Sequence, residues 1–179
     1  EKTGKYVLYG HWETANSYAS SQIAVATADH PAGPYTFLGH WRPGGKLRNW
    51  RSDGGIFPDS EYYKTSGVKA TVPTSVQEDV TQMGYTSRDF TVFVDDDGTA
   101  YLVSAEGHSM RVHRLNEEYT DVDFTTYAFS AADTKAADFE SYNYYDHVGR
   151  EAPAVVRADD GYYMASSGQS GWLPNQGTI

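Results

Sequence analysis

The sequence predicts an all-β protein made of repeated strand units, and three observations lead to this prediction. Seventeen Gly and seven Pro residues are spread between short runs of β-branched and aromatic residues, as in proteins built of many short strands. One strand–turn–strand pattern occurs twice in full, around Gly98 and Gly161, and once in part, around Gly4. Further strand-like segments follow the pattern. Helix should be scarce, because no stretch shows a sustained i, i+3, i+4 apolar spacing.

The repeated unit is an apolar-rich strand, an acidic turn that contains glycine, and a return strand with tyrosine and small apolar residues. The two full copies, 90–104 and 152–166, each follow an acidic residue, Asp89 in the first and Glu151 in the second. Glycine supplies the positive φ of a tight hairpin, and flanking Asp residues favour the turn through side-chain to backbone hydrogen bonds. Equivalent repeats begin equivalent strands at the same end of the molecule. We therefore expect the two carboxylates to lie close together.

Four strands in a unit make a propeller blade, and self-similarity on this scale is the sequence signature of a propeller. The additional strands are expected at 22–27, 34–39, 110–115 and 123–128. Two turn glycines lie 63 residues apart, more than a minimal blade of about 40–50 residues. Long loops are therefore expected at 42–86 and 130–150, and both end at a candidate acid. The chain is expected to be a partial propeller domain over 1–179, with blades at 1–86, 87–149 and, incomplete, 150–179.

Composition excludes several classes of function. The net charge of −10 argues against nucleic acid as a partner, because binding a polyanion needs a basic surface. No run approaches the roughly 18 apolar residues of a membrane span. Cysteine is absent, which removes disulfides, thiolate metal sites and cysteine nucleophiles. The six His residues show no metal-binding spacing, and we expect a monomer that needs no cofactor, with a structural calcium ion left open.

Several motifs in order resemble glycoside hydrolase family 43. Residues 87–102 resemble the segment that carries the second carboxylate of this family. Arg150-Glu-Ala-Pro-Ala resembles its general-acid strand, and Ser167-Gly-Gln-Ser-Gly-Trp-Leu-Pro-Asn the loop that follows. The form of these motifs, together with 4–34 (Gly-Lys-Tyr-Val through Pro-Ala-Gly-Pro), is most similar to the exo-β-1,3-galactanase-like subgroup. The resemblance implies a five-bladed β-propeller, of which this chain would cover about three blades.

The resemblance also implies an inverting mechanism with two carboxyl groups. Glu151 would be the general acid, which gives a proton to the leaving oxygen. Asp89 would be the carboxylate that helps Glu151 keep this proton, by like-charge proximity, and that orients it. The alternatives are a surface ion pair of Glu151 with Arg150 and a strand-end ion pair of Asp89 with Arg88. The residue that directs the water is not identifiable, and the repeat places a third acid before residue 1.

Sugar recognition needs aromatic faces and hydrogen-bonding side chains. Tyr18 matches a position of the subgroup that stacks on the sugar, and Trp172 belongs to the Gly-Trp-Leu-Pro-Asn loop. Ser170 stands where the subgroup usually has Thr and keeps the hydroxyl. With 26 aromatic residues in the chain, each of these aromatics could equally belong to the core. The other candidate sugar contacts are Arg88, Glu106 and His108, the last two at a strand end where the subgroup often carries Asn.

Two other groups of polar residues receive a structural interpretation. Asp95, Asp96 and Asp97 lie on a predicted hairpin turn, and the next copy has Asp159 and Asp160 at the same place. Turn chemistry explains both groups, so we leave them out of the site. His113 alternates with Val112 in a strand and is interpreted as part of its polar face.

The resemblance implies a glycosidase that removes galactosyl units from the end of a β-1,3-galactan or a related side chain. The partner would be an oligo- or polysaccharide, and we expect a secreted or periplasmic protein. Two alternatives remain open: an α-L-arabinofuranosidase or β-xylosidase of the same family, and a propeller that binds carbohydrate without catalysis. A neutral residue at the third-acid position would favour the non-catalytic alternative.

Overall fold

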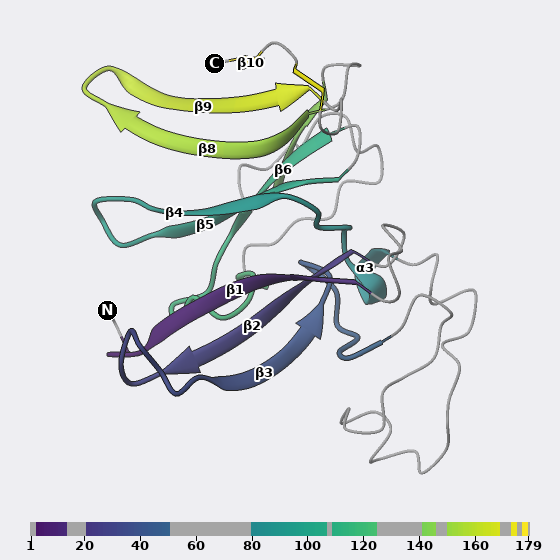
Figure 1. Ribbon diagram of the computed structural model, residues 1–179, viewed down its shortest axis with the longest axis vertical. Coiled ribbons are helices and arrows are strands. Elements are labelled where there is room, and N and C mark those ends of the chain that lie inside the picture. The colour runs from purple at the N-terminus through teal and green to yellow at the C-terminus, as the bar shows by residue number, and fades with distance from the viewer. Residues whose placement is uncertain are drawn as a thin grey trace. The chain divides into compact units, whose positions relative to one another are not determined.

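The computed structural model describes residues 3–13, 21–50, 80–106, 109–124, 141–145, 150–168, 173–174 and 177–178. These residues form three antiparallel sheets, which confirms the all-β prediction (Figure 1). The chain divides into two compact units. Unit 1 contains Glu1–Ser87 and Glu117–Asp121, and unit 2 contains Arg88–Asn116 and Val122–Ile179.

The sheet of unit 1 has three strands in the order β1-β2-β3. They are β1 (Tyr6–Trp12), β2 (Gln22–Ala28) and β3 (Thr36–Trp41). The central strand β2 is the most buried of these three strands, and its residues Ile23 and Val25 are fully inaccessible to solvent. A short helix, α3 (Val80–Met83), follows later in the unit.

The segment 117–121 is held in unit 1 although its neighbours in the sequence belong to unit 2. Its Asp121 accepts a hydrogen bond of 3.0 Å from the Trp41 indole N–H and pairs with the Arg48 guanidinium. The Tyr9 hydroxyl donates to the backbone carbonyl of Tyr119 at 2.8 Å. These contacts anchor the segment to the end of β3, to the loop after it and to β1.

Unit 2 contains the other two sheets, in the orders β4-β5-β6-β7 and β10-β9-β8. The four-stranded sheet consists of β4 (Phe90–Val94), β5 (Ala100–Ala105), β6 (Ser109–Arg114) and β7 (Ser141–Tyr145). The second sheet consists of β8 (Arg150–Ala158), β9 (Gly161–Gly168) and the short β10 (Gly177–Thr178).

The hairpin turn between β4 and β5 forms as the acidic sequence predicts. The Asp95 N–H donates to the Thr99 carbonyl at 2.8 Å, and the Gly98 N–H donates to the Asp95 carbonyl at 2.9 Å. The Asp97 carboxylate accepts from the Thr99 N–H at 2.7 Å. Gly98 has the positive φ of 82° that this turn requires. Gly161, in the turn between β8 and β9, also has a positive φ, of 159°.

The fourth strand of this sheet was predicted wrongly at 123–128. The strand that pairs with β6 is β7, at Ser141–Tyr145. Residues 123 and 124 lie in no strand, and 125–128 fall outside the described residues. The reason is that the chain turns back directly after β6: Leu115 and Val122 form an isolated antiparallel bridge, and the Asp123 N–H donates to the Arg114 carbonyl.

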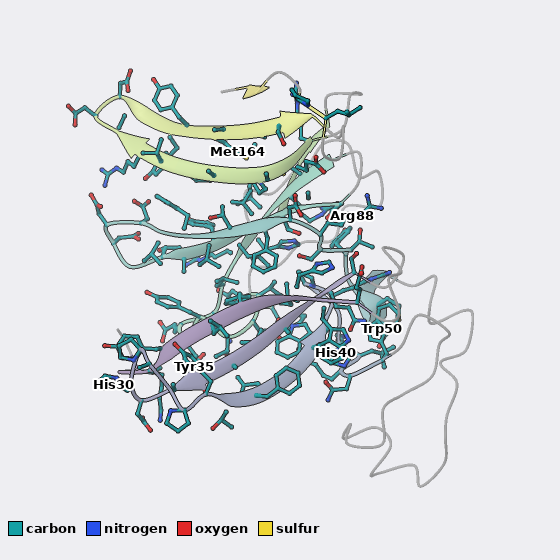
Figure 2. All side chains as sticks on the ribbon, in the orientation of Figure 1. His30, Tyr35, His40, Trp50, Arg88 and Met164 are labelled. Carbon is teal, nitrogen blue, oxygen red and sulfur yellow. The ribbon has the colours of Figure 1, made fainter. Side chains whose placement is uncertain are left out.

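An apolar cavity of about 310 Å³ lies between the two sheets of unit 2. Its walls include Phe93, Tyr101, Val112, Val155, Tyr162 and Met164, the last of which Figure 2 labels on β9. The Phe93 and Tyr162 rings meet edge to face with their centroids 5.7 Å apart. At the end of the cavity the Tyr162 hydroxyl donates to the Asp95 carboxylate at 2.6 Å. Apolar packing therefore joins β4–β6 to β8–β9.

His113 does not lie on a polar outer face, as the sequence had suggested. Its side chain and that of Arg111 are fully buried, whereas the alternating residues Met110 and Val112 line the apolar cavity. Both faces of β6 are thus covered, which a simple polar–apolar alternation cannot indicate. Burial, and secondly the nearby Arg111 charge, hold the pKa of His113 well below its ordinary value of 6.5.

The buried neutral His113 should make the protein less stable in acid. The unfolded chain binds a proton on this imidazole below about pH 6.5, while the folded protein does not, so stability is lost as the pH falls below that value. We expect the free energy of unfolding to fall by up to about 1.4 kcal/mol per pH unit more in the wild type than in His113→Asn. Urea unfolding at pH 7.5, 6.5 and 5.5 measures this, and equal slopes in the two proteins would contradict it.

Candidate active site

Three acidic residues lie at strand ends in unit 2. Asp89 directly precedes β4, Glu106 directly follows β5, and Glu151 is the second residue of β8. Asp89 continues the β4–β5 ladder, since its carbonyl accepts from the Ala105 N–H at 2.8 Å and the Arg88 N–H donates to the Ala105 carbonyl at 2.9 Å. The start of β4 and the end of β5 therefore meet at one edge of the four-stranded sheet.

A hydrogen bond joins this edge to the start of β8. The backbone N–H of Ala152 donates to the Asp89 carboxylate at 3.1 Å. Ala152 directly follows Glu151, so the carboxylate of Asp89 contacts the residue next to the other predicted acid. The structure thus brings together the two strand starts that carry the predicted acids, although Asp89 and Glu151 are 62 residues apart in the sequence.

The backbone at Glu151 is irregular in a specific way. The register of β8 against β9 shifts between Glu151 and Ala154, where two residues of β8, Ala152 and Pro153, face the single residue Ser166. Such a bulge bends a strand and redirects a side chain, and bulges are frequent beside active sites. Pro153 is buried and brings no N–H, so it suits a position outside the hydrogen-bond ladder.

Ala152 adopts a left-handed conformation with φ 51°. For a residue with a Cβ atom this conformation costs about 1–2 kcal/mol. It is maintained only where the surroundings hold it. The hydrogen bond to Asp89 is the polar contact that holds Ala152 among the described residues.

The Glu151 side chain is half-buried, and its carboxylate forms no hydrogen bond or ion pair with any described residue. Its backbone carbonyl accepts a long contact of 3.5 Å from the Ser167 hydroxyl on β9. The Asp89 carboxylate accepts from the Ala152 N–H. A carboxyl group held by its backbone, with its oxygens available, is suited to proton transfer to a ligand.

Glu106 pairs with Arg111, a residue that the sequence did not indicate as functional. The Arg111 side chain on β6 is completely buried, and its guanidinium contacts both oxygens of Glu106, with Nη2 to Oε2 at 3.3 Å. The Glu106 side chain is 10 % exposed. The ion pair holds this carboxylate in a fixed position at the end of β5. The alternation of residues along β6 was the one sequence signal that could have pointed to Arg111. This signal does not tell whether the face of β6 that carries Arg111 is buried.

The solved structures most informative for this geometry are those of galactan-degrading enzymes. An exo-β-1,3-galactanase from Clostridium thermocellum matches 98% of this chain and 29% of its own, with a TM-score of 0.64 and 27% identity. A family 43 β-1,3-galactosidase with galactodeoxynojirimycin matches 98% of this chain and 50% of its own (TM-score 0.66, 28% identity). The exo-β-1,3-galactanase from Phanerochaete chrysosporium matches 98% of this chain and 29% of its own (TM-score 0.61, 26% identity).

The chain resembles part of a family 43 exo-β-1,3-galactanase. The three sheets match part of the five-bladed propeller of these enzymes, which confirms the predicted fold and the predicted resemblance. The chain spans less than a third of the Clostridium and Phanerochaete proteins. No protein-family model matches the sequence, and neither does any curated protein.

Four of the predicted sugar contacts lie outside the described residues: Tyr18, His108, Ser170 and Trp172. Their roles stay predictions. The other two predicted sugar contacts are Glu106, described above, and Arg88. Arg88 is half-buried and precedes Asp89 at the start of β4, where Figure 2 labels it. In the part of the chain that the structure describes, no three acidic or His side chains are grouped so as to hold a metal ion, and no helix could span a membrane.

Unit 1 has a buried polar cluster at one end of its own sheet that the sequence did not indicate. The His40 Nδ1 and the Gln22 side-chain oxygen are 2.9 Å apart, and the Gln22 amide donates to the Trp50 carbonyl at 3.2 Å. The Trp12 ring stacks on His40 with centroids 4.2 Å apart. Figure 2 shows His40 and Trp50 at the same end of this sheet. The cluster fixes the end of β1, the start of β2 and the end of β3.

The buried ion pair of unit 2 gives a stability prediction. Glu106→Gln removes one charge and leaves the buried Arg111 guanidinium without its counterion, so we expect a loss of about 3–5 kcal/mol in the free energy of unfolding. Glu106→Gln combined with Arg111→Met should cost less than Glu106→Gln alone, because no buried charge remains. Urea unfolding measures both. A double variant that is less stable than Glu106→Gln would contradict this account of the pair.

Proposed function

We propose that this chain is part of an inverting glycoside hydrolase that removes galactosyl units from the end of a β-1,3-galactan or a related side chain. Glu151 is the general acid, and Asp89 is the carboxylate that orients it. One observation carries the proposal: the hydrogen bond from the Ala152 N–H to Asp89, which joins the start of β8, next to Glu151, to the start of β4.

The first step of the proposed reaction is proton transfer from the Glu151 carboxyl group. Its proton passes to the glycosidic oxygen as the bond from this oxygen to the anomeric carbon breaks, and the bonding electrons remain on the leaving oxygen. A water molecule adds to the anomeric carbon from the opposite face and gives its proton to a base. Among the described residues we assign no such base, so the step that activates water is left to a group not identified in this chain.

The choice of galactose rests on the similar proteins. A Phanerochaete exo-β-1,3-galactanase that lacks one glutamate side chain is known with β-1,3-galactotriose, and a family 43 β-1,3-galactosidase with galactodeoxynojirimycin. The net charge of −10 suits a neutral sugar better than an acidic one, because like charges repel. Arabinofuranosides and xylosides are the substrates to test beside galactan.

Replacing the proposed acid should abolish most of the activity. In the protein that carries this sequence in its full reading frame, Glu151→Gln should lower galactose release from β-1,3-galactan by a factor of about 10² or more, because Gln has nearly the same shape but no acidic proton. Glu118→Gln, at an exposed glutamate of unit 1, is the matched control and should retain wild-type activity.

Three results would revise this assignment. Unchanged activity in Glu151→Gln would remove Glu151 from the catalytic role. Release of arabinose or xylose, but not of galactose, would reassign the substrate. Tight binding of galacto-oligosaccharides without any release would favour a non-catalytic carbohydrate-binding propeller.

The stereochemical outcome is a separate test of the mechanism. An inverting enzyme that cleaves a β-galactosidic bond releases α-galactose first, since water attacks from the face opposite the leaving group. Proton NMR of the anomeric signals during the first minutes of hydrolysis measures this. β-Galactose as the first product would indicate retention, and the second carboxylate would then act as a nucleophile.

A further inference from the structure

The bulge of β8 directly follows one proposed acid, Glu151, and contacts the other, Asp89, through a backbone N–H. It comprises Ala152 and Pro153, and it begins one residue after Glu151. A side chain that follows a regular strand alternates strictly from one face to the other. A bulge breaks this alternation, so the direction of the Glu151 side chain depends on whether the bulge is present.

Two features indicate that the bulge depends on the Asp89 carboxylate. Ala152 has a left-handed φ of 51°, which an alanine disfavours. Its N–H does not join the ladder with β9 and donates instead to the Asp89 carboxylate, at 3.1 Å. Without this acceptor the strained alanine would lose the polar contact that holds it, and a regular strand would become the more favourable conformation for residues 151–154.

Asp89 is itself held firmly. Its carbonyl accepts from the Ala105 N–H at 2.8 Å, and the preceding Arg88 N–H donates to the Ala105 carbonyl at 2.9 Å. The carboxylate is thus presented from a four-stranded sheet toward the first residues of the other sheet of unit 2. A charged acceptor makes a stronger hydrogen bond to a backbone N–H than a neutral one does.

We propose that Asp89 positions Glu151 through the backbone of Ala152: its carboxylate holds the left-handed bulge that aims the acid at the substrate. This deepens the proposed function and rests on it. Asp89 is then a positioning residue whose effect has two parts, one from its charge and one from the geometry of its acceptor oxygen. The second part should be separable from the first by substitution.

The test compares Asp89→Asn with Asp89→Ala, and then adds Ala152→Gly to the alanine variant. Asn keeps an acceptor oxygen but no charge, so the bulge should persist. Ala removes both. Glycine reaches the left-handed region without the steric penalty of a Cβ atom, so Ala152→Gly should restore the bulge. The kcat of the double variant should then be about threefold to tenfold higher than that of Asp89→Ala alone, with little change in KM. The matched control is Ala154→Gly in the same background, at a position without positive φ.

A second measurement is independent of catalysis. Hydrogen–deuterium exchange resolved to single amides by NMR reports directly on the Ala152 N–H. We expect exchange of this N–H to be about tenfold or more faster in Asp89→Ala than in the wild type, and close to the wild type in Asp89→Asn.

The outcomes separate the two proposals. Rescue by Ala152→Gly but not by Ala154→Gly, with the expected exchange pattern, supports the positioning role. Equal exchange in Asp89→Ala and the wild type, or no rescue by Ala152→Gly, overturns it while the glycosidase function stands. A wild-type protein that protects the Ala152 N–H but releases no sugar refutes the function, and with it any catalytic meaning of the bulge.

Discussion

The hydrogen bond between the Ala152 N–H and the Asp89 carboxylate is the contact on which the candidate site depends. It ties the start of β8 to the start of β4, and therefore one sheet of unit 2 to the other at the end where the acids lie. Apolar packing of Phe93 and Tyr162 joins the same sheets farther along the strands. Packing brings the sheets together without direction, whereas the hydrogen bond fixes which residues meet.

Strain and charge act together at this contact. A left-handed alanine is unfavourable by itself. The Asp89 carboxylate offsets this cost, since it gives the Ala152 N–H a charged acceptor. Functional sites often contain such locally unfavourable features, which the surrounding fold maintains. The buried Arg111 guanidinium, paired with Glu106, supplies a fixed charge at the nearby end of β5.

The sequence predicted the strand units, the hairpin turn at Gly98 and the placement of Asp89 and Glu151 at strand starts, because repeats and turn chemistry are local signals. It did not predict β7, since the strand after β6 is determined by how residues 115–123 turn back and not by their apolar pattern. It also missed the burial of Arg111 and His113, which depends on neighbours distant in the sequence. The Glu-Ala-Pro motif was recognised by resemblance, and its physical meaning, a bulge with a left-handed alanine, became evident only from the register of β8 against β9.

The most direct test of this account is a crystal structure of the full-length protein with β-1,3-galactobiose bound to the Glu151→Gln variant. The account predicts that the side chain of residue 151 lies within hydrogen-bond distance of the glycosidic oxygen, about 2.6–3.2 Å. It also predicts that Ala152 keeps its positive φ and its bond to Asp89. A disaccharide bound away from this residue, or a regular β8 without the bulge, would contradict it.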